Sequence, residues 1–172
     1  GAGAPIAVQS MCATHTQDIP ATLNQISALV DHGADVVRIA VDSKRDVEAL
    51  REIRSKTSAR LVVDLQESYR LIAQVAAIVD GVRYNPGHLH HHEKEVPVRD
   101  KVAHIVEAAR MHGSALRIGI NFGSLDPNRK GEHEDPLEAA LDSAREHVGY
   151  MEELGFHNYV VSLKSSDPND VI

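Results

Sequence analysis

The sequence VRYNPG, at residues 82–87, begins with a β-branched residue, carries an arginine and ends at a proline followed by a glycine. Proline and glycine end a strand and its hydrogen-bonding ladder, so we predict a strand over residues 82–85. Three further apolar runs also carry a cation: VVRIAV at 36–41, LRIGINFGS at 116–124 and VVSLKSSD at 160–167. Lys and Arg are almost never fully buried without a partner. Strands that bring several cations to one place therefore indicate a pocket for an anion.

Short β-branched runs of this kind alternate with longer segments of helical period, which is typical of a parallel sheet with crossover helices. Strands are predicted at residues 5–11, 36–41, 60–65, 82–85, 115–121 and 158–164. Helices are predicted at about 19–33, 45–56, 69–79, 97–112 and 136–154, with a further helix beginning at 167–168. Asp18 and Pro20 suit the start of the first helix, and Gly33 suits its end.

Six strand–helix units favour an α/β fold of the TIM-like (β/α)8 barrel type, truncated to about six βα units. A complete barrel has eight strands and ~250 residues, so residues 1–172 are interpreted as one partial barrel domain. An open flavodoxin-like sheet is the alternative. A doubly wound sheet usually has a glycine-rich phosphate loop after its first strand, and Gln9, Ser10 and Met11 have no such loop after them.

Composition restricts the class of function. The chain has 172 residues, a formal net charge of −7 and 25% charged residues. An acidic chain without a basic stripe is not expected to bind nucleic acid. No apolar run reaches the ~20 residues that span a bilayer, and no signal-peptide pattern opens the chain, so we expect no membrane association and a cytoplasmic location.

The candidate site lies at the carboxyl ends of the strands, where parallel α/β folds bind ligands. Side chains two or four residues apart share one face of a strand, which joins Arg83 to Asn85 and Arg117 to Asn121. Arginine forks and a lysine point charge suit phosphate or diphosphate oxygens. One carboxylate among four cations would leave three charges uncompensated. The candidates are Arg38, Asp64, Arg83, Asn85, Arg117, Asn121 and Lys164, with Ser10 at the end of the first strand.

Histidine and cysteine give weaker signals. The loop HLHHH at residues 88–92 has no spacing that fixes a ligand geometry, so we expect no native metal site there. Cys12 is the single cysteine; it cannot build a cluster or zinc site alone, and we interpret it as a small buried core residue rather than a nucleophile. Four histidines on or beside predicted helices are expected at the surface: His104, His112, His147 and His157.

The runs GAPIAVQSM, GADVVRIAV, VVDLQESYRLIAQVA, VRYNPG, RIGINFGSL and VSLKSSD resemble, in this order, the hydroxymethylbutenyl diphosphate synthase family. The resemblance covers nearly the whole chain. It implies an N-terminal TIM-like barrel that binds methylerythritol cyclodiphosphate. It also implies a separate C-terminal domain, absent from this chain, that holds a [4Fe-4S] cluster. That family performs the penultimate step of the methylerythritol phosphate route of isoprenoid biosynthesis.

The resemblance further implies a role for each candidate. Arg38, Arg83, Arg117 and Lys164 match the family's diphosphate-binding cations, and Asp64, Asn85 and Asn121 match its polar substrate contacts. The family acts as a homodimer and receives electrons from ferredoxin or flavodoxin, in the cytoplasm or the plastid stroma. The cluster cysteines and the catalytic glutamate have no match here, so no catalytic residue is assigned and no turnover is expected from the fragment alone.

One departure from the family pattern concerns residues 66 and 67, where the family usually has His-Phe and this chain has Gln66 and Glu67. Glutamine can form hydrogen bonds but cannot transfer protons as histidine can. Two other functions stay open: a pterin-binding barrel of the dihydropteroate synthase type, and a non-catalytic phosphate-binding barrel. The former should have an asparagine soon after the first strand, whereas Ser10, Met11 and Cys12 occupy that position.

Overall fold

The computed structural model describes residues 3, 5–65, 68–91, 93–126 and 135–170. Six parallel strands form one sheet in the order β1-β2-β3-β4-β5-β6. Their bounds are β1 Gln9–Met11, β2 Val36–Val41, β3 Leu61–Leu65, β4 Gly81–Tyr84, β5 Ala115–Asn121 and β6 Tyr159–Lys164. The α-helices between them are α1 Ile19–Asp31, α2 Lys44–Lys56, α3 Ile72–Val75, α4 Val98–His112 and α6 Pro136–Glu153.

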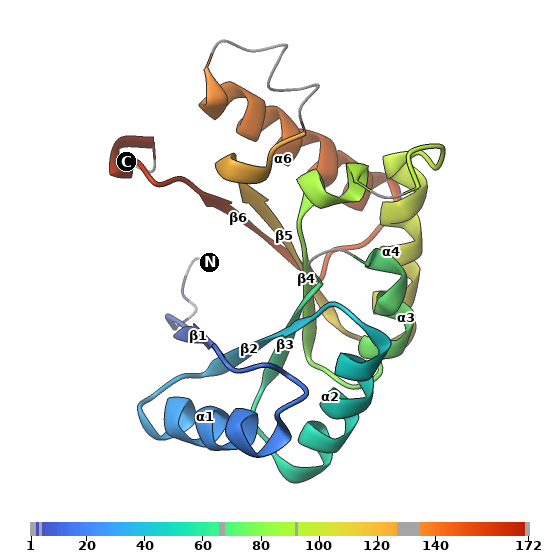
Figure 1. Cartoon of the computed structure of the whole chain (residues 1–172). Coiled ribbons are helices and arrows are strands. Elements are labelled where there is room, and N and C mark those ends of the chain that lie inside the picture. Colours follow the sequence, from blue (N-terminus) through green and yellow to red (C-terminus); the bar gives the residue numbers. More distant parts are fainter. Residues whose placement is uncertain (1–2, 4, 66–67, 92, 127–134, 171–172) are drawn as a thin grey trace.

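The sheet is strongly curled, with the helices along its outer side (Figure 1). Sequential strand order excludes the open alternative, because a doubly wound sheet has its first strand in the interior of the sheet. A sector of a TIM-like barrel is therefore the observed architecture, which confirms the predicted fold class. Short 3-10 helices follow three of the strands: η1 Tyr69–Leu71, η2 Pro86–His90 and η3 Phe122–Ser124. A fourth, η4 Pro168–Asp170, lies where the sequence predicted the start of a sixth helix.

Strand faces alternate as the sequence pattern requires. In β2, Val37, Ile39 and Val41 are buried and face the helices, whereas Arg38 is half-buried and faces the concave side. The same alternation along β5 buries Leu116, Ile118 and Ile120. The hydrophobic core therefore lies between the sheet and the helices, and the concave side of the sheet is left for polar residues.

Helix boundaries follow from local capping. The Asp18 side chain accepts a hydrogen bond from the Ala21 backbone amide at 3.2 Å, with Pro20 in the first turn of α1. Ser43 and Asp46 form a capping box at the start of α2, in which side chain and backbone satisfy each other's donors. Gly113 ends α4 in the left-handed conformation at φ 70°, which favours glycine.

Two predicted elements are shorter in the structure. β1 covers Gln9–Met11 rather than residues 5–11, because Gln9 pairs with Val36, the first residue of β2, and the residues before Gln9 have no residue of β2 in register. The helix predicted at 69–79 is a 3-10 turn followed by four α-helical residues. The Val75 carbonyl accepts hydrogen bonds from the Ile78 and Val79 amides, which closes the segment in tight turns before β4.

The prediction of a surface position for His147 is wrong. Its side chain is 1% exposed, and its Nδ1 lies 3.0 Å from the Tyr84 hydroxyl of β4. The reason lies in the spacing, because His147 is on the buried face of α6, together with Ala139, Ala140, Ser143 and Met151. His104 is half-buried against the Tyr69 ring, at 5.9 Å between ring centroids, whereas His112 and His157 are exposed as predicted.

Candidate functional site

The charged residues of four neighbouring strands lie on the concave face of the sheet. Asp64 is in register with Arg83, and Arg83 with Arg117, so these three side chains form a row across β3, β4 and β5. Side chains in register on parallel strands share a face. Arg38 lies on the same face of β2, two residues before Ala40, which is the residue in register with Asp64. The structure thus places these four charged residues on one face of the sheet.

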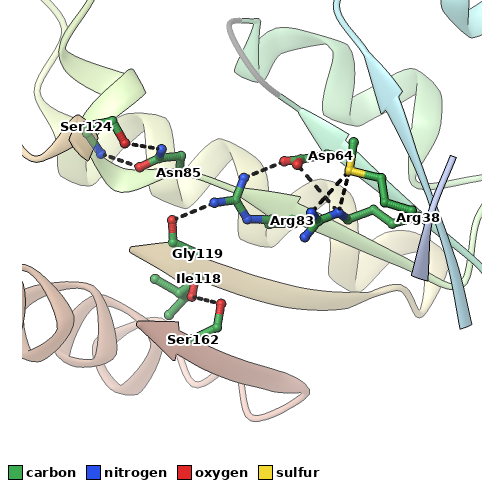
Figure 2. Close-up of polar contacts among 10 residues, drawn as sticks. Arg38, Asp64, Arg83, Asn85, Ile118, Gly119, Ser124 and Ser162 are labelled. Atoms are coloured by element: carbon green, nitrogen blue, oxygen red, sulfur yellow. Dashed lines mark hydrogen bonds and ion pairs between the residues drawn. The ribbon is translucent and has the colours of Figure 1, made fainter. Parts of the chain in front are cut away.

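Asp64 binds two of the arginines. Its Oδ1 accepts a hydrogen bond from Arg83 Nη1 at 2.7 Å, and its Oδ2 lies 3.7 Å from Arg38 Nε. Figure 2 shows the carboxylate between the two guanidinium groups. Asp64 is 4% exposed, so water cannot replace these partners easily. A buried carboxylate of this kind is stable only when it is paired and hydrogen-bonded, and the sequence assigned it only one arginine.

Both arginines have a second contact that fixes their direction. Arg83 Nη2 donates to the Gly119 carbonyl at 3.0 Å, so its guanidinium bridges β3 and β5 (Figure 2). Arg38 Nε and Nη2 lie 3.3 and 3.2 Å from the Met11 sulfur, a weak acceptor. Sequence reasoning missed Met11 and Gly119. The signal for Gly119 was present, because it stands on the same strand face as Arg117 and Asn121.

Arg117 differs from its neighbours. In the part of the chain that the structure describes, its side chain has no hydrogen bond and no ion pair. Burial lowers the pKa of Arg117, and the positive charges of Arg38 and Arg83 lower it further. Lys164 stands in register with Asn121 at the end of β6, exposed and without an ion pair to any described residue. Both cations are therefore available to an anion from outside the chain.

The two asparagines stand at the ends of β4 and β5 and organise the loops there. Asn85 Oδ1 accepts from the Gly87 amide at 3.0 Å, and its Nδ2 donates to Ser124 Oγ at 2.7 Å (Figure 2). Asn121 Oδ1 accepts from the Gly123 amide at 3.2 Å. Each asparagine thus forms an Asx-type turn before a 3-10 helix. Asn85 is 4% exposed, so its amide is engaged in joining the loops.

The contact between these loops also explains why residue 87 is a glycine. A Cβ atom at Gly87 would stand 1.5 Å from the Ser124 carbonyl oxygen, which no side chain could accommodate without moving the backbone. Gly87 therefore allows the loop after β4 to pack directly on the loop after β5. This packing holds the carboxyl ends of the two strands together, beneath which Arg83 and Arg117 lie in register.

Cys12 and the histidine loop lie outside this group. Cys12 is 6% exposed, which confirms its predicted place in the core, and burial raises the pKa of its thiol to about 11. His88 and His91 stack at 5.3 Å between ring centroids, and His90 Nε2 lies 3.3 Å from Asp126 Oδ2. Within the described ranges, no three His, Cys, Asp or Glu side chains gather as a metal site would require. Nor is any described helix long and apolar enough to cross a membrane.

A pocket of about 600 Å³ opens beside the histidine loop, lined by His90, His91, Lys94, Val96, Pro97, Val98, Lys101 and Asp126. None of the four concave-face cations lines it. We assign the candidate site to the concave face because uncompensated charge, rather than volume, indicates an anion. The substitutions at residues 66 and 67, noted from the sequence, lie outside the described residues.

Comparison with known proteins identifies the family of the chain. The model of the GcpE TIM-barrel domain family matches residues 1–172. A protein of Rhodopirellula baltica, named 4-hydroxy-3-methylbut-2-en-1-yl diphosphate synthase (flavodoxin), is 54% identical over 174 residues, which cover 100% of this chain and 46% of that protein. A protein of the same name from Nautilia profundicola is 40% identical over 97% of this chain and 46% of its own length. The chain thus spans less than half the length of these relatives.

Solved structures share the architecture at low sequence identity. Dihydropteroate synthase of Yersinia pestis is similar with a TM-score of 0.62 and 14% identity, over 90% of this chain and 56% of that one. A phospho-2-dehydro-3-deoxyheptonate aldolase of Thermotoga maritima has a TM-score of 0.59 and 14% identity, over 97% of this chain and 44% of that one. At such identity the likeness supports the barrel fold alone.

Proposed function

The chain belongs to the GcpE TIM-barrel domain family, and from this we propose that it is the substrate-binding barrel of a 4-hydroxy-3-methylbut-2-en-1-yl diphosphate synthase. Its substrate would be methylerythritol cyclodiphosphate, which the whole enzyme opens by two-electron reduction with loss of one oxygen as water. The pterin-binding alternative is not favoured, because its support is a likeness of fold.

The observation that carries this proposal is the surplus of positive charge on the concave face. Four cations face one described carboxylate, Asp64, and two of them, Arg117 and Lys164, have no described partner. Uncompensated charge in a partly buried site is costly unless a ligand of opposite charge arrives. A diphosphate supplies that charge, and arginine forks match its oxygen atoms.

The contacts within the site suggest a division of roles. Arg117 and Lys164 would bind the diphosphate oxygens directly. Asp64 would hold Arg38 and Arg83 in place, which leaves their remaining N–H groups directed at the ligand. Asn121 has no described partner for its Nδ2 group and could donate to a substrate oxygen, whereas Asn85 would act through the loops it joins.

An iron–sulfur cluster does not fit this chain. A [4Fe-4S] cluster needs several thiolate ligands, and the chain has Cys12 as its one cysteine, with a thiol pKa raised to about 11 by burial. The cluster that the family resemblance implies would belong to a part of the enzyme outside this sequence. We therefore assign binding and orientation of the substrate to the present residues and derive no electron-transfer step from them.

Partners follow from the same proposal. The names of both relatives contain the word flavodoxin, so we propose a flavodoxin as electron donor, with ferredoxin as the alternative carrier. We also propose a homodimer, in which the cluster domain of one subunit covers the barrel mouth of the other.

The test is calorimetric titration of the full-length enzyme with methylerythritol cyclodiphosphate. Arg117→Ala should weaken binding by about ten- to a hundredfold, the range for loss of a charge-assisted hydrogen bond of about 1.5–3 kcal/mol. Arg117→Lys should recover part of the affinity, since it restores charge without the fork.

The matched control is Arg145→Ala, which removes one positive charge from an exposed pair on α6 and should leave affinity unchanged. Equal affinity for the wild type and Arg117→Ala would refute the assignment of Arg117. His91→Ala, on the histidine loop, should also change little, and a large loss there would place the binding site beside that loop instead.

A further inference from the structure

We propose that Gly119 is a positioning residue of the anion site: its missing side chain leaves the space in which the Arg83 guanidinium lies. The inference rests on the proposed function, because it concerns how one of the diphosphate-binding cations is held. Gly119 is in β5, on the concave face between Arg117 and Asn121.

The steric requirement is direct. A Cβ atom at Gly119 would lie 2.1 Å from Arg83 Nε, 2.6 Å from Cζ and 2.7 Å from Nη2. All three distances are below the shortest contacts that a Cβ atom makes. The backbone of Gly119 is not in the left-handed region, so its conformation does not itself require glycine. Glycine is needed here because of the guanidinium, and not because of the chain's own geometry.

Arg83 has little freedom to move aside. Nη1 is hydrogen-bonded to Asp64 at 2.7 Å and Nη2 to the Gly119 carbonyl at 3.0 Å. A methyl group at residue 119 would displace the guanidinium from both acceptors at once. Asp64 would keep only Arg38, at the longer distance of 3.7 Å. Gly119 thus affects both the ligand site and the Asp64 carboxylate, and it does so through Arg83.

The space left by the missing side chain of Gly119 also determines where the Arg83 guanidinium lies relative to Arg117. Arg83 comes from β4 but extends over β5, in register with Arg117. The two guanidinium groups are close enough for the charge of Arg83 to lower the pKa of Arg117. Two positive charges held in proximity, one of them the unpaired Arg117, favour a ligand that carries more than one negative charge. Gly119 is what permits that proximity.

A double-mutant cycle in the full-length enzyme tests the proposal, with methylerythritol cyclodiphosphate as the titrated probe. We expect Gly119→Ala to lower affinity about tenfold, as loss of one charge-assisted contact would. In the Arg83→Ala background, the same substitution should cost nothing further, since no guanidinium remains to be displaced. Gly149→Ala is the matched control, because a Cβ there meets nothing within 4 Å, and it should bind as the wild type does.

Unchanged affinity of Gly119→Ala, or an equal loss in both backgrounds, would overturn the proposal. Thermal unfolding of the wild type, the two single variants and the double variant shows whether each is folded. A folded Gly119→Ala protein with weakened binding would have lost affinity through displacement of the Arg83 guanidinium and not through misfolding. A ligand-free measurement is the ¹⁵N–¹H signal of the Arg83 side chain, which should shift in Gly119→Ala and not in Gly149→Ala. If the wild type failed to bind the cyclodiphosphate, the proposed function would be refuted, while an unshifted Arg83 signal would refute the positioning role separately.

Discussion

The two halves of the concave face both carry cations, but those of one half are paired within the chain and those of the other half are not. On β2–β4, Asp64 pairs with Arg38 and Arg83, and each arginine has a second acceptor. On β5–β6, Arg117 and Lys164 have neither a carboxylate nor another acceptor among the described residues. The charges of one half are paired within the chain, and the charges of the other half would be paired by the anion that we propose as ligand.

This difference separates stability from binding. A paired arginine contributes to the folded state and is costly to remove, whereas an unpaired arginine is repelled by its neighbours and contributes only when a ligand is present. In the proposed site, the paired arginines would hold their geometry before the ligand arrives, and the unpaired cations would supply affinity for it. Substitutions in the two halves should therefore have opposite effects on stability.

The largest effect is expected for Asp64→Asn, which leaves two half-buried arginines without a negative partner. Removing one member of a buried ion pair typically costs about 3–5 kcal/mol; here the arginines are 25% and 16% exposed, so we expect about 2–3 kcal/mol in the free energy of unfolding. Denaturant unfolding measures it. The control is Glu52→Gln, which removes an exposed pair with Lys56 and should cost less than about 0.5 kcal/mol. Equal losses in the two variants would contradict the comparison.

A smaller effect, of opposite sign, is expected for Arg117→Met. Burial and the charges of Arg38 and Arg83 already lower the pKa of Arg117. An apolar side chain of similar length should be neutral or stabilising by up to about 1 kcal/mol without ligand. The same substitution at Arg83 should destabilise, because Asp64 loses its 2.7 Å partner. Thermal unfolding of Arg117→Met and Arg83→Met measures the two effects. Destabilisation by both substitutions would mean that Arg117 is paired in the folded protein.

The smallest effect is expected at an exposed pair, Glu93 with Arg70. Hydrogen bonds from Arg70 and Tyr69 lower the pKa of Glu93 to about 2, from an ordinary value of 4.5. A depressed carboxyl pKa contributes stability that is fully present above pH 4.5 and is lost as the pH falls toward about 2. Glu93→Gln should flatten the pH dependence of unfolding in that window alone. A difference that instead persisted unchanged across the window would exclude this linkage.

Local patterns predicted most of the elements. The alternation of buried and concave-facing residues in β2 and β5 follows directly from sequence spacing, and both strands have the predicted bounds. The start of α1 at Asp18 and the end of α4 at Gly113 follow from capping preferences. The misplacement of His147 came from treating histidine as polar without regard to its position on the stripe of α6. The short β1 and α3 depended on neighbours, which local sequence does not specify.

The sequence by itself determined which residues face the concave side, because side chains alternate along a strand with a period of two. It also determined that cations outnumber carboxylates there. Only the tertiary structure decided which cations are paired, because that depends on the register between strands. The register sets Asp64 beside Arg83 and leaves Arg117 next to two like charges. The contact of Arg83 with Gly119 is likewise a product of packing, since the residues lie 36 positions apart in the chain.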